Sequence, residues 1–137
     1  MDLVCGAGGV TYGMTQSEHI EVVVAVNHDE DAIMAHKANH PNVVHLMEDI
    51  QDVDRIFPHL PKKVDILWAS AECTNHSNAK GGINRDADSR SLPEYLPAYI
   101  DECDPDFFIV ENVREFRNWG PLRAKEDEDG STKNYCC

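Results

Sequence analysis

The chain has 137 residues, which is enough for one hydrophobic core of ordinary size but not for two domains. Its formal net charge of -13 repels phosphate backbones, so binding to DNA would need clustered basic residues or a further segment. The five cysteines are odd in number and lack a framework spacing, and the sequence shows no signal peptide or long apolar run. We therefore expect a reduced, cytoplasmic protein without a membrane anchor.

A short strand and a glycine-rich loop open the chain. Residues 2–4 form the expected strand, and the loop Gly6–Gly9 precedes an expected helix over residues 11–17. Glycines between a strand and a helix let the backbone approach a ligand closely. A dinucleotide fingerprint would need a third small residue where Thr11 stands, so an NAD-linked oxidoreductase is only a distant alternative.

Three more strands and one helix are predicted over the middle of the chain. Residues 20–26 are rich in β-branched side chains and indicate a buried strand, and residues 43–46 and 64–69 indicate two more. The helix between the first two of these has acidic residues in its first turn, beginning at Asp29, and ends before Pro41.

A long amphipathic helix and a fifth strand follow. Ser91 and Glu94 have the spacing of a capping box, and apolar residues then recur at helical intervals at Leu92, Tyr95, Leu96, Tyr99, Ile100 and Cys103. Residues 107–110 form the expected fifth strand, and no further strand is predicted after Trp119. The alternation of strands and helices predicts an α/β fold with a doubly wound, mostly parallel, Rossmann-like sheet.

Two strand ends carry side chains suited to catalysis. Cys73 follows the strand at residues 64–69, and Glu111 and Asn112 follow the fifth strand. In an open parallel sheet, ligands bind just beyond the carboxyl ends of the strands. A small buried thiol and a surface carboxylate are the structural alternatives for Cys73 and Glu111.

A zinc site is a weaker hypothesis. His36 and His40 lie four residues apart, and Cys73 and His76 have ligand-like spacing. No second pair has matching spacing, so we expect no metal.

Four motifs, in order, resemble those of the cytosine-5 DNA methyltransferases. They are Asp2–Gly9 (D-L-V-C-G-A-G-G), Asp49-Ile50, Ala71-Glu72-Cys73 and Glu111-Asn112-Val113. The E-C-T sequence at residues 72–74 resembles that of some phage-type members. The resemblance covers residues 2–116 but only the amino-terminal part of the family's catalytic domain, and it implies a strand order of 3-2-1-4-5.

The resemblance also implies a cofactor and a mechanism. S-adenosylmethionine would be bound by the first strand end, the glycine loop and four later residues, namely Val4, Gly6, Ala7, Gly8, Gly9, Asn27, His28, Asp49 and Ile50. Cys73 would attack carbon 6 of cytosine, Glu111 would act at ring nitrogen 3, and Asn112 would orient the site. Val4 and Asn27 replace the family's usual phenylalanine and acid, and Glu72 replaces a proline, which would raise the pKa of the Cys73 thiol.

We expect residues 1–119 to form this cofactor-binding part and residues 120–137 to be a polar tail, truncated or disordered. The target-recognition region finds no counterpart, so DNA would be held by segments outside this chain. The predicted activity is methylation of carbon 5 of cytosine, in a bacterial or phage restriction-modification setting, with the activity of this chain alone in doubt. The alternative is a cofactor-binding remnant without turnover. No obligate protein partner is inferred.

Overall fold

The computed structural model describes residues 1–71, 87–118, 122–126 and 132–136. Its centre is a parallel five-stranded sheet in the order β3-β2-β1-β4-β5, as predicted. The strands are β1 (Asp2–Leu3), β2 (Val24–Val26), β3 (Val44–Leu46), β4 (Ile66–Ala69) and β5 (Phe107–Val110).

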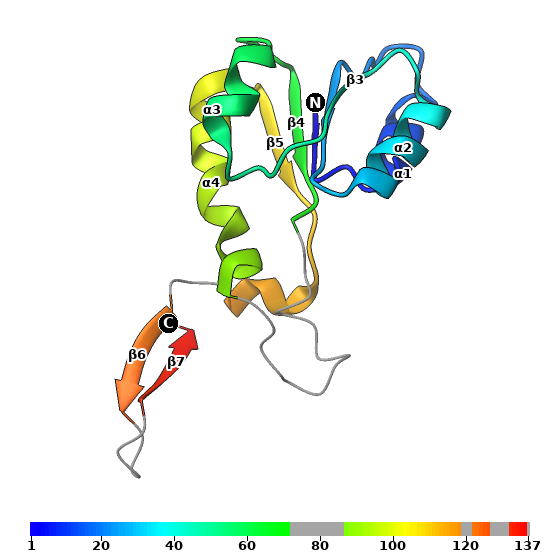
Figure 1. Ribbon diagram of the computed structural model, residues 1–137. Helices are drawn as coiled ribbons and strands as arrows, with labels where there is room; N and C mark the ends of the chain where they lie inside the picture. The colour runs from blue at the N-terminus through cyan, green and yellow to red at the C-terminus, as the bar shows by residue number, and fades with distance from the viewer. Residues whose placement is uncertain (72–86, 119–121, 127–131, 137) are drawn as a thin grey trace.

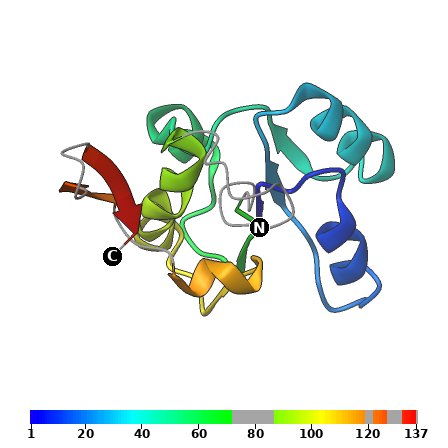
Figure 2. The same ribbon diagram turned by 90° about the horizontal axis from the view of Figure 1, so that it is seen from below.

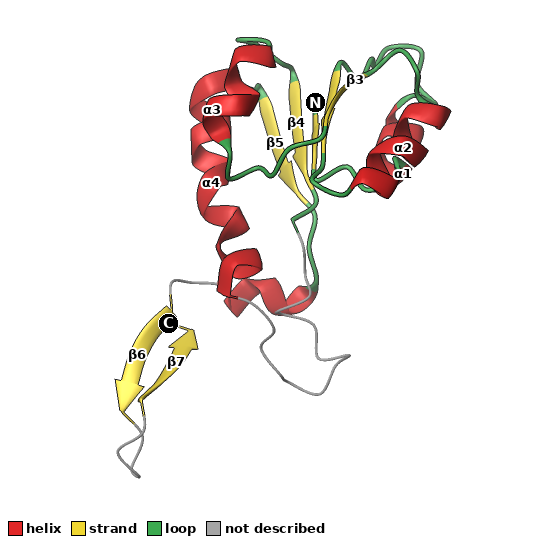
Figure 3. Ribbon diagram, viewed as in Figure 1, coloured by secondary structure: helices red, strands yellow, loops and turns green. Residues whose placement is uncertain are grey.

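Helices cover both faces of the sheet, as expected for a doubly wound fold (Figures 1 and 2). One face carries α1 (Gly9–Met14) and α2 (Glu30–Asn39), and the other carries α3 (Val53–Ile56), the 3-10 turn η1 (Phe57–His59) and α4 (Ala87–Cys103). Figure 3 shows the sheet as a thin yellow layer between the two groups of red helices. None of the helices in the described ranges is long and apolar enough to cross a membrane.

The register aligns the carboxyl ends of the strands at one edge. Leu3 pairs with Val26 on one side and with Ala69 on the other, and Val26 in turn pairs with Leu46. Ala69 pairs with Val110. The residues that follow each strand therefore leave the sheet at the same level, which is the lower edge in Figure 1.

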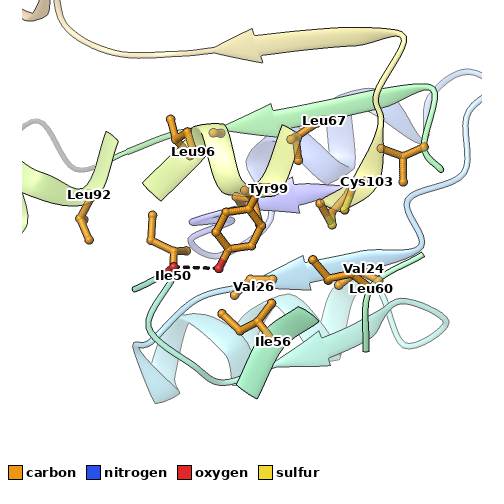
Figure 4. Close-up of a cluster of buried hydrophobic side chains, with 14 residues drawn as sticks. Val24, Val26, Ile50, Ile56, Leu60, Leu67, Leu92, Leu96, Tyr99 and Cys103 are labelled. Carbon is orange, nitrogen blue, oxygen red and sulfur yellow. Dashed lines mark hydrogen bonds between the residues drawn. The ribbon is translucent and has the colours of Figure 1, made fainter. Parts of the chain in front are cut away.

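The larger core lies between the sheet and α4 (Figure 4). Leu92, Leu96, Tyr99 and Cys103 of α4 are all buried, which confirms the apolar spacing predicted for that helix. The Tyr99 ring meets Phe57 of η1 edge-on, with 5.1 Å between ring centroids. Tyr99 also donates a hydrogen bond of 2.8 Å to the carbonyl of Ile50, so α4 holds the segment that follows β3.

Several element boundaries differ from the prediction. The predicted strand at residues 20–26 shortens to β2, because β1 and β3 pair only with Val24–Val26. Helix α1 lies at Gly9–Met14 and not at residues 11–17, since Gly8 turns the chain into it. The capping-box prediction was wrong, because α4 begins at Ala87 and Ser91 lies inside it.

Five elements were not predicted. The short helix α3 and the turn η1 follow β3, where Asp52 precedes the helix and Pro58 lies in the turn. Beyond β5 come η3 (Arg114–Asn118) and a hairpin of β6 (Leu122–Glu126) and β7 (Thr132–Cys136), so the expectation of no further strand was wrong. The hairpin pairs with itself in an antiparallel register and forms a second sheet.

Candidate cofactor and catalytic site

The loop after β1 makes a tight left-handed turn. Val4, Gly6 and Gly8 have φ of 58°, 52° and 98°, and the Gly8 amide donates to the Cys5 carbonyl at 3.1 Å. A β-branched residue such as Val4 adopts positive φ only at a cost of about 1–2 kcal/mol, which the surrounding fold must offset. Backbone strain of this kind concentrates at functional sites, and here it lies at the start of the predicted cofactor loop.

The glycines of the loop differ in what surrounds them. A Cβ atom at Gly6 or Gly9 would have no other atom within 4 Å, so the backbone there borders open space. A Cβ at Gly8 would lie 3.0 Å from Cδ2 of both His36 and His40. Gly6 and Gly9 therefore fit a ligand cradle, whereas Gly8 is required by packing against two histidine rings, a role that sequence reasoning missed.

The ends of β2 and β3 lie beside this loop. The Asn27 amide N–H donates to the Leu46 carbonyl at 3.1 Å, and its side-chain Oδ1 accepts from the Asp29 N–H at 2.9 Å. Asp29 in turn caps α2 by accepting from the Ala32 N–H at 2.8 Å. Asn27 is 6 % exposed, and with its Oδ1 engaged it offers mainly an amide donor to a ligand.

Asp49 and Ile50 lie in the turn after β3. The Asp49 carboxylate accepts from the Gln51 N–H at 3.0 Å, and Ile50 is buried beneath Tyr99. The adjacent order of β1, β2 and β3 places the backbones of the loop, Asn27 and Asp49 at one edge of the sheet, as the cofactor prediction requires. His28 follows Asn27 at this edge and is exposed.

The catalytic candidates are only partly visible. Cys73 lies outside the described residues, as does His76 of the zinc hypothesis. Glu111 directly follows β5, where its N–H donates to the Ala69 carbonyl at 2.9 Å, and it is exposed. Among the described residues, no group of three or more His, Cys, Asp or Glu side chains is placed to hold a metal ion.

Asn112 ties two strand ends together. Its Nδ2 donates to the Ala71 carbonyl at 2.9 Å, and its Oδ1 accepts from the Val113 N–H at 2.8 Å. Because Ala71 is two residues before Cys73, this amide holds the segment leading to the thiol against the segment carrying Glu111. The orienting role of Asn112 that the resemblance implies stays a prediction, because Cys73 lies outside the described residues.

A buried polar chain lies under the loop, and sequence reasoning missed it. The Thr11 hydroxyl donates to Asp2 Oδ2 at 2.9 Å, His36 Nε2 is 3.0 Å from the same hydroxyl, and His36 Nδ1 is 2.8 Å from His45 Nε2. Asp2, Thr11 and His36 are each 0 % exposed. The available signal was His36, which lies one helical turn after the buried Ile33 on the face of α2 that packs on the sheet.

Burial is the main cause of the pKa shifts of Asp2 and His36 in this buried polar path. Loss of water raises the pKa of Asp2 to about 6, although the Thr11 hydroxyl and the amino terminus oppose the shift. Burial and the neighbouring rings of His45 and His40 lower the pKa of His36 to about 4. At neutral pH Asp2 is therefore ionised and His36 is neutral.

Three basic side chains of the described residues pair with acids. Lys62 pairs with Glu102, Lys63 with Asp104 and Asp106, and Arg55 with Glu48. Pairing with acids makes these three cations less available for contact with phosphate.

Comparison with known proteins identifies the family. The sequence model of the C-5 cytosine-specific DNA methylases matches residues 1–121. The chain belongs to this family. The type II methyltransferase M.AgeI of Thalassovita gelatinovora is 33 % identical over 120 residues, which are 82 % of this chain and 27 % of that protein. M.PspPI of Psychrobacter sp. (strain TA137) is 32 % identical, over 83 % of this chain and 27 % of its own length.

Solved structures agree with the family assignment. A prophage-encoded DNA modification methyltransferase from E. coli superposes with a TM-score of 0.65 at 26 % identity, over 84 % of this chain and 32 % of that one. The Spodoptera frugiperda DNMT2 structure shares the fold, with a TM-score of 0.57 at 23 % identity over 86 % and 36 % of the two chains. The fold is that of the S-adenosylmethionine-dependent methyltransferases, and this chain spans about a quarter of the length of the two type II relatives.

Proposed function

We propose that this chain is the S-adenosylmethionine-binding part of a DNA cytosine-5 methyltransferase and that it acts in the cytoplasm. The observation that carries the proposal is the hydrogen bond from the Asn112 side chain to the Ala71 carbonyl, which joins the ends of β4 and β5 at the edge of the sheet where the glycine loop also lies. Family membership supports the chemistry, and the open space over Gly6 and Gly9 fits a bound cofactor.

Each candidate residue has a distinct role in the proposed reaction. The bound cofactor would supply the methyl group. The loop at Gly6–Gly9 and the side chains of Asn27 and Asp49 would hold it at the ends of β1 to β3. Cys73 would form a bond to carbon 6 of cytosine, which makes carbon 5 nucleophilic, while Glu111 supplies a proton or hydrogen bond at ring nitrogen 3. Asn112 would fix the spacing between these two groups.

DNA is the proposed substrate, held by segments that this chain lacks. A cytosine must leave the duplex to reach such a site, at a cost of a few kcal/mol that contacts to the DNA must supply. The charge of -13 and the paired lysines leave little for that purpose. The purified chain should accordingly show little methyl transfer to DNA on its own, and robust incorporation of a tritiated methyl group would contradict this.

Cofactor binding is the first test. Titration calorimetry with S-adenosylhomocysteine should show binding to the purified chain. Asn27→Asp should bind several-fold more tightly, because an aspartate can still accept from the Asp29 N–H and adds a second acceptor for a ribose hydroxyl. Absence of binding by both proteins would refute the cofactor assignment.

The nucleophile is tested in a chimera in which residues 1–121 replace the matching part of M.AgeI. The chimera should form a covalent adduct with DNA carrying 5-fluorocytosine, whose fluorine blocks the final elimination. Cys73→Ser should abolish the adduct, Glu111→Gln should slow it, and Glu72→Pro should speed it by lowering the thiol pKa. An adduct that survives Cys73→Ser would show that another residue is the nucleophile.

The alternative function is a cofactor-binding module without turnover. It is favoured by the formal net charge of -13, which repels the phosphates of DNA. Binding of S-adenosylhomocysteine combined with an inactive chimera would support this alternative over the methyltransferase.

A further inference from the structure

Four side chains under the cofactor loop form an unbroken hydrogen-bonded path from a partly exposed histidine to a fully buried carboxylate. The path runs from His45 on β3 through His36 on α2 and Thr11 on α1 to Asp2 on β1. It therefore joins four elements that surround the Gly6–Gly9 loop. None of these four side chains has a role in the cofactor binding or the catalysis proposed above.

The direction of every hydrogen bond in this path depends on the charge of Asp2. When Asp2 is ionised it can only accept, so Thr11 donates to it and has no second proton. His36 must then donate from Nε2 to Thr11 and accept at Nδ1 from His45. Both imidazoles are thus held as the Nε2–H tautomer.

When Asp2 is protonated, the same distances allow the reverse arrangement. Asp2 donates to Thr11, Thr11 donates to His36 Nε2, and His36 donates from Nδ1 to His45 Nε2. The two arrangements differ by one proton. That proton reaches the path through the partly exposed His45 ring, and each hydrogen along the path moves one position, so the carboxylate is neutralised without contacting water.

We infer that His36 is a positioning residue of the cofactor loop and, with Thr11 and His45, relays protons between solvent and the buried Asp2 carboxylate. The inference about the loop rests on the proposed cofactor binding, while the relay itself does not. His36 also packs against Gly8, where an added Cβ would lie 3.0 Å from its ring, so its orientation bears directly on the loop.

The relay should make cofactor binding depend on pH. Above the Asp2 midpoint the bonds end on a charged carboxylate, and charge-assisted hydrogen bonds are the stronger ones. Below it the bonds are neutral and weaker, so the loop is held less firmly. The titratable and charged groups facing the path are few: Asp2 and Cys5 with the Met1 amino group, His36 and His40 with Lys37, and His45.

Histidine side-chain nitrogen NMR on the intact 137-residue chain tests the relay without any ligand. At pH 8 both His36 and His45 should be Nε2–H tautomers. As Asp2 protonates, with a midpoint of about 6, both should convert to Nδ1–H while remaining neutral. A His36 ring that keeps the Nε2–H tautomer while the Asp2 carboxyl carbon titrates would overturn the relay.

Variants test the link to the loop. Affinity for S-adenosylhomocysteine should fall at least about threefold from pH 7.5 to 5.0 in the unmodified chain and in Thr11→Ser, which keeps the hydroxyl. Thr11→Val should abolish that pH dependence, and His36→Gln, which can donate to Thr11, should bind more tightly than His36→Leu. Equal pH profiles for Thr11→Ser and Thr11→Val would refute the positioning role. If the unmodified chain does not bind S-adenosylhomocysteine, the proposed function is refuted. The proton relay is then decided by the NMR measurement alone.

Discussion

At the residue scale, the four glycines near the start of the chain are not equivalent. Gly8 has φ of 98° and touches two histidine rings, whereas Gly13 lies in α1 with nothing within 4 Å of an added Cβ. The same substitution should therefore have opposite effects at the two positions. The sequence shows both simply as glycine, and only the surroundings separate them.

Gly8→Ala should destabilise the chain by about 2 kcal/mol or more, because alanine is strained at positive φ and its methyl group meets His36 and His40. Gly13→Ala is the matched control and should stabilise by about 0.5–1 kcal/mol through reduced backbone entropy of the unfolded chain. Urea denaturation followed by circular dichroism measures both values. A Gly8→Ala protein as stable as the parent would contradict the packing role.

The buried Asp2 carboxylate should also impose a pH dependence on stability. Its pKa rises from 3.8 to about 6 on folding, so the stability that it contributes is fully present below pH 3.8 and is lost as the pH rises through 6. His36 acts in the opposite sense. Its pKa falls from 6.5 to about 4, so its contribution is present above pH 6.5 and is lost as the pH falls through 4.

Asp2→Asn should remove the pH dependence that the buried Asp2 carboxylate imposes on stability. Relative to the parent, the variant should gain stability between pH 4 and pH 7, by up to about 3 kcal/mol for a shift of this size. Asp101→Asn, which changes an exposed carboxylate on α4, is the control and should show no such gain. Denaturant midpoints at five or six pH values measure the difference, and parallel curves for Asp2→Asn and the parent would contradict the raised pKa.

At the element scale, α4 stabilises the turn after β3 that carries Asp49. This helix lies on the face of the sheet opposite α1 and α2. Its Tyr99 hydroxyl holds the Ile50 carbonyl directly after Asp49, and the ring packs on Phe57 (Figure 4). Asn112 does the same for the catalytic edge by holding Ala71. Neither contact could be predicted from spacing, because each joins segments more than 40 residues apart.

Tyr99→Phe should cost about 1–2 kcal/mol of stability, because the buried Ile50 carbonyl loses its partner while the ring packing remains. The turn at Asp49 should loosen, so affinity for S-adenosylhomocysteine should fall as well. Tyr95→Phe, at a half-buried position of the same helix, is the control. If Tyr99→Phe binds S-adenosylhomocysteine with unchanged affinity, the hydrogen bond from Tyr99 to Ile50 does not contribute to cofactor binding.

At the scale of the whole molecule, the sheet ends in an uncovered edge strand. The four residues of β5 are all exposed, Phe107 by 66 % and the other three by 37 % each. An apolar edge strand of this kind readily pairs with another chain.

The purified chain should therefore self-associate as its concentration rises, and Phe107→Lys should suppress this by placing a charge on the edge strand. Tyr12→Lys is the control, because Tyr12 is similarly exposed at 63 % but lies on α1, which has no free hydrogen-bonding edge. Light scattering over a concentration series measures the difference. Equal suppression by both substitutions would show that association depends on general apolar exposure and not on the strand edge.

The sequence by itself determined the five strands of the parallel sheet, the helices α1, α2 and α4, and the positions of the glycine loop and Glu111-Asn112, because hydrophobic periodicity and turn residues are local signals. Only the tertiary structure decided which side chains lie together. Examples are the hydrogen-bonded path from Asp2 through Thr11 and His36 to His45, the packing of Gly8 against two histidine rings, and the hydrogen bond from Asn112 to Ala71. The tertiary structure also decided the length of β2 and the start of α4. Burial is the physical reason, since the pKa of a side chain and the partner of a hydrogen bond depend on neighbours that are distant in sequence.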